Sequence, residues 1–138
     1  MFSANKGISD ASLFKIASGG ELSRILLSVK YVLSKHSKLP TMIFDEIDTG
    51  VSGEISNAMA NMMLKMSNEM QIIAITHLPQ VAAKGNYQLN VYKSNFLNTT
   101  TTKVKLLNSE ERIDQIAKML AGDLITKSAL NHAKELLN

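Results

Sequence analysis

The sequence of 138 residues contains no cysteine, no tryptophan and only two prolines. Without cysteine, the chain forms no disulfide and holds no cysteine-ligated zinc, which fits a reducing, cytoplasmic setting. No apolar run approaches the roughly 20 residues that a membrane-spanning helix needs. The first ten residues also lack the apolar centre of a signal peptide. We therefore expect a cytoplasmic protein with no membrane partner.

The chain also lacks a large excess of either sign of charge. Fifteen Lys and Arg residues face twelve Asp and Glu residues, which gives a formal net charge of +3. The lysines are scattered, so this charge permits contact with nucleic acid without arguing for it. Lys30, Lys35 and Lys38 could contact phosphates, although a solvated helix face is the simpler interpretation. The length suffices for one domain with its own core.

The spacing of apolar residues predicts an α/β chain. A helix is expected from Gly20 to about His36 and a second one from Ser52 to about Ser67, the second with a methionine-rich face that we interpret as core. Apolar runs at 41–46 and 71–77 predict two buried strands. Because these strands alternate with helices, we expect them to be parallel neighbours. The apolar face predicted for the first helix comprises Leu22, Ile25, Leu26, Val29, Val32 and Leu33.

The last third of the chain predicts a hairpin followed by two helices. Residues alternate as in strands over 87–93 and 100–107, and the stretch between them suits a hairpin connection. Asn108 with Glu111 can cap the first of the two helices, and Gly122 can end it. Thr126 can cap the second.

Two adjacent glycines open the first predicted helix, in the stretch Ser18-Gly19-Gly20-Glu21. Ser18 and Glu21 have the spacing of a capping box, in which each side chain accepts a hydrogen bond from the backbone of the other. Capping does not explain the glycines, because glycine in a helix costs up to about 1 kcal/mol relative to alanine. Gly19 and Gly20 instead leave backbone N–H groups bare, so that an anion can approach the helix N-terminus.

Polar side chains follow both predicted parallel strands. Asp45 and Glu46 end one strand, and Thr76 and His77 end the other. Ligands of open α/β sheets bind beyond the carboxyl ends of the strands. At such an edge an aspartate can help to hold Mg²⁺, a following glutamate can polarise an attacking water, and a histidine can reach a γ-phosphate. Taken singly, an acidic pair is more often a solvated loop start, and a histidine is more often a hydrogen-bonded surface or core residue.

The order of these motifs resembles the second half of an ATP-binding-cassette ATPase head. Residues 18–21 match the signature motif, 42–46 the Walker B strand, 48–53 the D-loop and His77 the switch histidine. Longer stretches, among them "PTMIFDEIDTGVSGEIS" and "RIDQIAKMLAGD", resemble the C-terminal head segment of the RecN family of bacterial double-strand-break repair ATPases, which are related to the SMC proteins. The resemblance implies a partial P-loop head lobe over residues 1–138, with a mainly parallel sheet flanked by helices.

The resemblance also implies roles for individual residues. Glu46 would be the general base, His77 would contact the γ-phosphate, and Asp45 would hold Mg²⁺. Transporter D-loops usually finish Leu-Asp, whereas this chain has Val51-Ser52 there. Asp48 and Ser52 are therefore both candidates for nucleotide contact, and Ser52 is alternatively the N-cap of the following helix.

The signature motif acts in trans in such ATPases. By this resemblance, Ser18, Gly19, Gly20 and Glu21 would face the γ-phosphate of ATP that is bound to a second head. ATP would then join two heads into a homodimer.

The chain has no Walker A motif, because none of its seven glycines has another glycine five residues on. In RecN and its relatives this motif lies near the N-terminus, beyond a long coiled coil. The resemblance thus implies one lobe of a split head, whose partners are the N-terminal Walker A lobe, a second head and DNA, with a nucleoid-associated location. Alone, the chain is expected to be inactive as an enzyme and to self-associate through the strand at 71–76.

Two other functions stay open at this point. A non-catalytic dimerisation or binding module could retain the cassette pattern, although intact Glu46 and His77 count against it. Asp45, Glu46 and Asp48 could instead form a metal-dependent nuclease cluster, but no acidic partner strand is evident. ATPase activity of the chain alone and with its Walker A lobe would separate the three functions.

Overall fold

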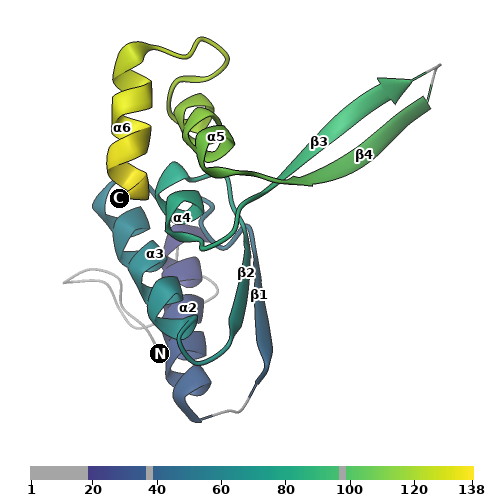
Figure 1. Ribbon diagram of the computed structural model, residues 1–138. Coiled ribbons are helices and arrows are strands. Elements are labelled where there is room, and N and C mark those ends of the chain that lie inside the picture. Colours follow the sequence, from purple (N-terminus) through teal and green to yellow (C-terminus); the bar gives the residue numbers. More distant parts are fainter. Residues whose placement is uncertain (1–18, 37–38, 97–98) are drawn as a thin grey trace. The chain divides into compact units, whose positions relative to one another are not determined.

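A computed structural model describes residues 19–36, 39–96 and 99–138 of the chain (Figure 1). The chain divides into two compact units, Met1–Val81 and Ala82–Asn138. In chain order the elements are α2 (Gly19–His36), β1 (Thr41–Asp45), α3 (Glu54–Met66), β2 (Gln71–Ile75), α4 (Pro79–Lys84), β3 (Leu89–Phe96), β4 (Thr99–Leu106), α5 (Ser109–Ala121) and α6 (Lys127–Leu137). The α/β class is as predicted. Within the described ranges, no helix is long and apolar enough to span a membrane.

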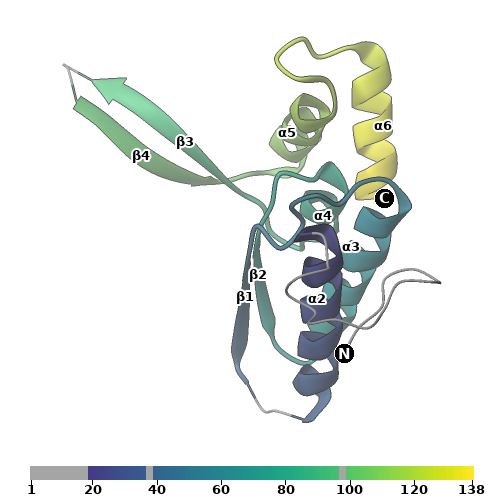
Figure 2. The ribbon, with the colours of Figure 1, turned by 180° about the vertical axis from the view of Figure 1, so that it is seen from behind.

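In the first unit, β1 and β2 form a parallel pair, as predicted from the order of the elements. Thr41 lies opposite Gln71, and Asp45 lies opposite Ile75. Figures 1 and 2 show α2 and α3 on the same side of this pair. A parallel pair needs such a helical crossover, and α3 supplies it.

The core of the first unit lies between the strand pair and its helices. Met42 and Phe44 alternate with exposed neighbours along β1, so one face of the strand is buried. The methionines of α3 fill much of this core, as predicted. The buried apolar residues are Leu27, Met42, Phe44, Ile47, Val51, Met59, Ala60, Met63, Met66, Met70 and Val81.

The buried face of α2 is not the predicted one. Gly20, Leu27 and Ser34 are its buried residues. Four members of the predicted apolar face are 46–57% exposed, namely Leu26, Val29, Val32 and Leu33. Likewise β2, expected to be buried, is mostly exposed. Apolar periodicity identifies a stripe that avoids water but does not identify the neighbour that covers it, and the described residues leave this stripe open.

Two boundaries around the turn after β1 also differ from the prediction. Glu46 lies outside the strand and has a positive φ of 47°. Helix α3 begins at Glu54, and its N-cap is Gly53, with no side-chain hydrogen bond to the cap. The predicted role of Ser52 as N-cap is therefore wrong. The helix begins one residue later than predicted from that cap, because Gly53, at φ 59°, is the residue that leads into it.

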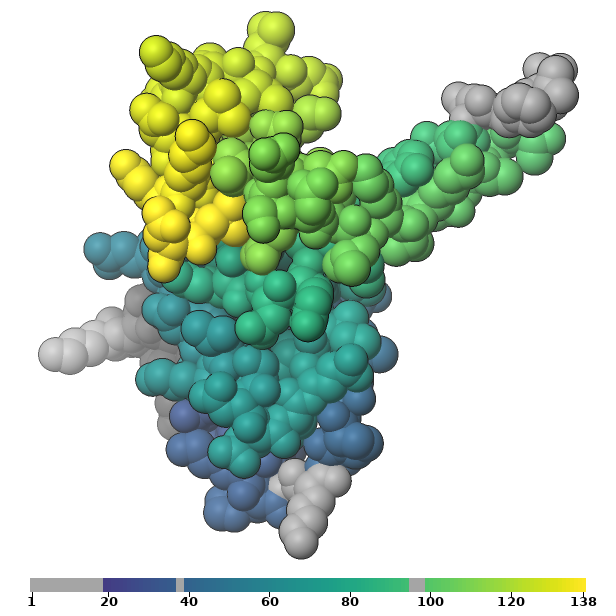
Figure 3. Space-filling model, viewed as in Figure 1, coloured from purple at the N-terminus to yellow at the C-terminus, as the bar shows by residue number. Residues whose placement is uncertain are grey.

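In the second unit, β3 and β4 form an antiparallel hairpin, with Leu89 opposite Leu106 and Phe96 opposite Thr99. Strand β3 ends three residues later than predicted and β4 begins one residue earlier, so the connection between them is shorter than predicted. All of β4 is exposed, and the space-filling view shows the two strands as an open ribbon (Figure 3). The predicted caps of α5 and α6 are confirmed, including the capping box of Asn108 with Glu111, the C-cap Gly122 and the N-cap Thr126.

Helices α5 and α6 pack through small and branched side chains. Ile116, Ala117 and Ala133 are fully buried. The side chain of Arg112 ties the start of α5 to the end of α4, because it donates hydrogen bonds to the carbonyl oxygens of Ala83 and Gly85 at 3.3 and 2.6 Å.

Candidate functional site

The carboxyl end of β1 presents two exposed carboxylates, those of Asp45 and Glu46. The backbone N–H of Glu46 donates to the carbonyl oxygen of Ile75 at 3.1 Å, and its own carbonyl oxygen accepts from the backbone N–H and the hydroxyl of Thr49 at 3.2 and 2.9 Å. A positive φ is uncommon for glutamate and needs such support from its neighbours. The turn therefore fixes where the Glu46 side chain leaves the backbone.

The oxygen ligands at the carboxyl end of β1 suit an Mg²⁺ ion that is bound mainly by the phosphates of a nucleotide. In nucleotide sites Mg²⁺ is commonly bound through one or two carboxylates together with substrate phosphates and waters. Asp45 offers one such carboxylate. Across the described ranges, no group of three or more His, Cys, Asp or Glu side chains could hold a metal by itself. Asp48 is buried away from the exposed pair, so the three acids of the nuclease hypothesis do not form an open cluster.

A small hollow of about 300 Å³ lies beside the acidic edge. It joins one stripe of α2 to the end of β1. Lys30 lines the hollow, and its ammonium group lies 5.4 Å from the ring centroid of Phe44, a distance at which a cation interacts with an aromatic face. The lining residues are Ser23, Leu26, Lys30, Ile43, Phe44, Asp45, Glu46 and Ile47.

Asp48 links the turn after β1 to the end of β2. Its side chain is only 1% exposed, and its Oδ2 accepts a short hydrogen bond from the hydroxyl of Thr76. The same hydroxyl oxygen accepts from the backbone N–H of Leu78 at 2.9 Å. The Oδ1 atom of Asp48 lies 3.8 Å from Nδ1 of His77, whose side chain is 64% exposed. The structure thus brings Asp48 and His77 together, and no sequence pattern indicates the hydrogen bond between Thr76 and Asp48.

The two signature glycines differ in their surroundings. Gly20 is buried, and a Cβ atom added to it would lie 2.8 Å from the carbonyl oxygen of Gly50. Gly19 is exposed, and an added Cβ would meet no described atom within 4 Å. Close packing therefore explains Gly20 without an anion, and Gly19 is the glycine that packing leaves unexplained.

The other predicted site residues are placed as follows. Ser18 lies outside the described residues, so its capping box with Glu21 stays a prediction. Glu21 is half-buried in the first turn of α2 and has an interaction partner. Ser52 is exposed, as is Gly53 after it, whereas Val51 before it is buried.

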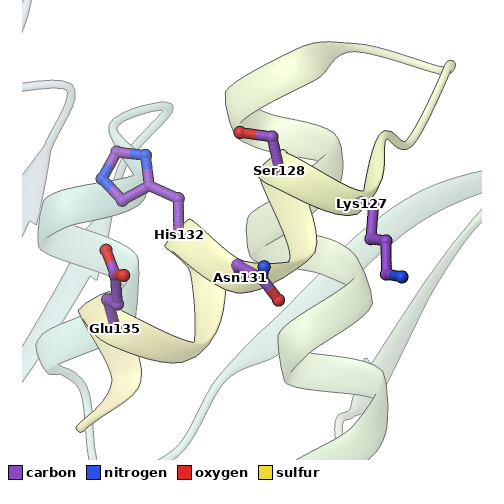
Figure 4. Close-up of a pocket in the computed structure, with 5 residues that line it drawn as sticks. All are labelled: Lys127, Ser128, Asn131, His132 and Glu135. Atoms are coloured by element: carbon purple, nitrogen blue, oxygen red, sulfur yellow. The ribbon is translucent and has the colours of Figure 1, made fainter.

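A larger hollow of about 600 Å³ lies along α6. Figure 4 shows its five lining side chains projecting from that one helix, with no second element contributing a residue. A ligand site needs polar groups that converge from several directions, so we do not assign a function to this surface. The lining residues are Lys127, Ser128, Asn131, His132 and Glu135.

The chain is similar over almost its whole length to proteins named DNA repair protein RecN. The protein of Haemophilus influenzae is 43% identical over 135 residues, covering 98% of this chain and 24% of the relative. That of Bacillus subtilis is 44% identical over 137 residues, covering 99% and 24%. The chain thus spans about a quarter of the length of the curated relatives it matches. No protein-family model matches it.

Two solved structures share the fold. One, described as "Structural biochemistry of ATP-driven dimerization and DNA stimulated activation of SMC ATPases", has a TM-score of 0.60 at 23% identity and covers 77% of this chain and 63% of its own. The other, "Crystal structure of the SmcHead bound to the C-winged helix domain of ScpA", has a TM-score of 0.62 at 26% identity and covers 74% and 30%. The predicted resemblance to RecN and the predicted class, part of an SMC-type ATPase head, are both confirmed.

Proposed function

We propose that this chain is the C-terminal lobe of a RecN-type ATPase head and serves the repair of DNA double-strand breaks. One observation carries the proposal. The parallel register sets Asp45 opposite Ile75, so Glu46 and the pair Thr76–His77 leave the sheet at the same edge. A water-activating carboxylate and a phosphate-contacting imidazole need this common edge.

Each residue at the edge has a distinct part in the proposed hydrolysis. Asp45 would hold Mg²⁺ together with phosphate oxygens of ATP, and the ion would neutralise charge that develops on the transferred phosphoryl group. Glu46 would accept the proton of the attacking water. His77 would hydrogen-bond the γ-phosphate from the neighbouring strand end.

The signature end of α2 would serve a second head. Its 18 residues give the N-terminus a helix dipole of about half a positive charge. The exposed backbone at Gly19 would meet the γ-phosphate of ATP bound to that second head, with Ser18, Gly20 and Glu21 supporting the motif. Ser52, exposed in the D-loop, is the better candidate for direct nucleotide contact, since Asp48 is buried.

The missing Walker A lobe would cover the open side of the first unit. The exposed apolar residues of the strand pair, Ile43, Ile73 and Ile75, lie in register on one face. A contiguous exposed apolar surface is typical of an interface. The likeness to proteins named for DNA repair supports DNA as a further partner and a nucleoid-associated, cytoplasmic location for the complete protein.

ATPase measurements test the proposal. We expect no hydrolysis by the chain alone and measurable hydrolysis by the full-length protein or by the chain joined to its Walker A lobe. Hydrolysis in the joined form should fall when Glu46 becomes glutamine. A joined form that binds DNA and dimerises without hydrolysing ATP would instead indicate the non-catalytic module.

A further inference from the structure

The buried carboxylate of Asp48 is only half satisfied. Oδ2 accepts the hydroxyl hydrogen of Thr76, whereas Oδ1 has no hydrogen-bond partner among the described residues. Burying a carboxylate is costly unless it is paired and hydrogen-bonded. The cationic or hydrogen-bonding group placed to satisfy Oδ1 is Nδ1 of His77, 3.8 Å away. The fold of the turn alone does not explain why a buried carboxylate oxygen without a partner faces the imidazole of His77.

Asp48 and the chain segment around His77 are both held in place by hydrogen bonds. The carbonyl oxygen of Asp48 accepts from the backbone N–H of Val51 at 3.1 Å, which closes the turn after β1. The hydroxyl of Thr76 donates to Asp48 and accepts from the backbone N–H of Leu78. The residues directly before and after His77 are therefore both fixed. The separation of 3.8 Å exceeds the roughly 2.7–3.2 Å of an N–H···O hydrogen bond, so the exposed imidazole has to move toward Oδ1 to form one.

We propose that Asp48 is a positioning residue for His77: it accepts a hydrogen bond from Nδ1–H and thereby directs Nε2 outward toward the nucleotide. The inference rests on the proposed function, in which His77 contacts a phosphate. It replaces direct nucleotide contact by Asp48, whose carboxylate is 1% exposed. The partner of one imidazole nitrogen sets the role of the other, as in Asp–His pairs elsewhere. The turn after β1 thus acts on catalysis through the end of β2.

The Asp48→Asn variant in the full-length protein tests this arrangement. An asparagine keeps the size and, through its carbonyl oxygen, the bond to Thr76, but presents an NH₂ group to His77. That group donates where the carboxylate accepted, so Nδ1 loses its hydrogen. We expect kcat for ATP hydrolysis to fall about 10-fold or more, by analogy with the loss of the carboxylate partner of a metal-ligating histidine, while KM for ATP changes little. Asp123→Asn, an exposed aspartate of the second unit, is the matched charge control and should match the parent protein.

Two further measurements separate positioning from a merely structural role. In a His77→Ala background, Asp48→Asn should cause no further loss of kcat, because the two residues act through one group. Imidazole ¹⁵N NMR should show hydrogen on Nδ1 of His77 in the parent protein and on Nε2 in Asp48→Asn. Independent losses of kcat in the double variant, or a hydrogen pattern that Asp48→Asn leaves unchanged, would overturn the inference. If the parent protein hydrolyses no ATP, the proposed function fails, and the NMR result alone still decides whether Asp48 holds Nδ1–H.

Discussion

The backbone of Gly50 lies so close to Gly20 that Gly20 has no room for a side chain. A Cβ atom on Gly20 would lie 2.8 Å from the carbonyl oxygen of Gly50, and Gly50 itself adopts a φ of +74°. The first turn of α2 is thereby packed onto the turn that follows β1. The stretches predicted to be the signature motif and the D-loop therefore pack against each other within one chain.

This contact predicts that Gly20→Ala destabilises the protein whereas Gly19→Ala does not. The new methyl group at position 20 must displace backbone atoms, and overpacking of this kind costs about 1–3 kcal/mol. A Cβ atom added to Gly19 meets no described atom within 4 Å, so alanine there should be neutral or stabilising by up to about 1 kcal/mol. Thermal unfolding of the two variants measures the difference. Equal melting temperatures would contradict the packing explanation.

The trans role of the signature motif is better tested at Gly19 than at Gly20. Gly20→Asp should abolish hydrolysis, but the clash with Gly50 would contribute to that loss. Gly19→Asp adds the same charge without the clash, so hydrolysis should be lost while the fold and nucleotide binding to the protein's own Walker A segment persist. Equilibrium titration with ATP, alongside circular dichroism, gives the measurement. Loss of first-site ATP affinity in Gly19→Asp would argue against action in trans.

Replacing Glu46 by glutamine should separate ATP binding from hydrolysis. The amide retains the shape but cannot accept the proton of water, so turnover should fall roughly 10²-fold or more. ATP should still bind, and the dimer of heads should accumulate with ATP bound. Glu69→Gln, at an exposed position after α3, controls for the lost charge. Hydrolysis near the parent rate in Glu46→Gln would remove Glu46 from the proposed mechanism.

Local signals in the sequence sufficed for much of the fold. The caps at Asn108, Gly122 and Thr126 were predicted because the hydrogen bonds that end a helix lie within a few residues of it. The parallel pair followed from the alternation of helices and strands. The Asp45–Glu46 edge followed from an apolar run that ends in acids.

What the sequence could not give depends on distant neighbours. The contact between Gly20 and Gly50 and the bond between Thr76 and Asp48 join residues about thirty positions apart, and no spacing rule connects them. The buried face of α2 was wrong because only one of its buried residues, Leu27, is a large apolar side chain, so apolar periodicity does not mark that face. Ser52 was predicted as the N-cap because a serine hydroxyl before a helix can accept a backbone hydrogen bond. In the structure Gly53, with its positive φ, is the N-cap instead.

The ion pair of Lys105 with Glu111 predicts a pH effect on the second unit. The hydrogen bond from Lys105 holds the pKa of Glu111 below its usual value of 4.5, and the same bond raises the pKa of Lys105. Because the folded pKa of Glu111 is lowered, its stabilisation is present above pH 4.5 and is lost as the pH falls through the folded value. Acid unfolding of Lys105→Met should therefore depend less on pH below 4.5 than that of the parent. Added salt should weaken the effect, since both groups are exposed.

The open apolar face of the first unit predicts self-association of the chain when its proposed partner lobe is absent. Among the described residues β2 pairs with β1 only, which leaves its second edge with unpaired backbone groups. Ile43, Ile73 and Ile75 add 41–58% exposed apolar side chains beside that edge. Such an edge is a template for pairing with another chain.

Light scattering at micromolar concentration should accordingly show species larger than a monomer, and adding the Walker A lobe should replace them by a one-to-one complex. Charged residues at the open face, as in the double variant Ile43→Lys and Ile73→Lys, should suppress both kinds of association. Leu124→Lys is the matched control, because Leu124 is 85% exposed but belongs to the second unit. A chain that stays monomeric and does not change mass with the Walker A lobe would contradict the prediction. Equal suppression by Leu124→Lys would show that association does not use the strand face.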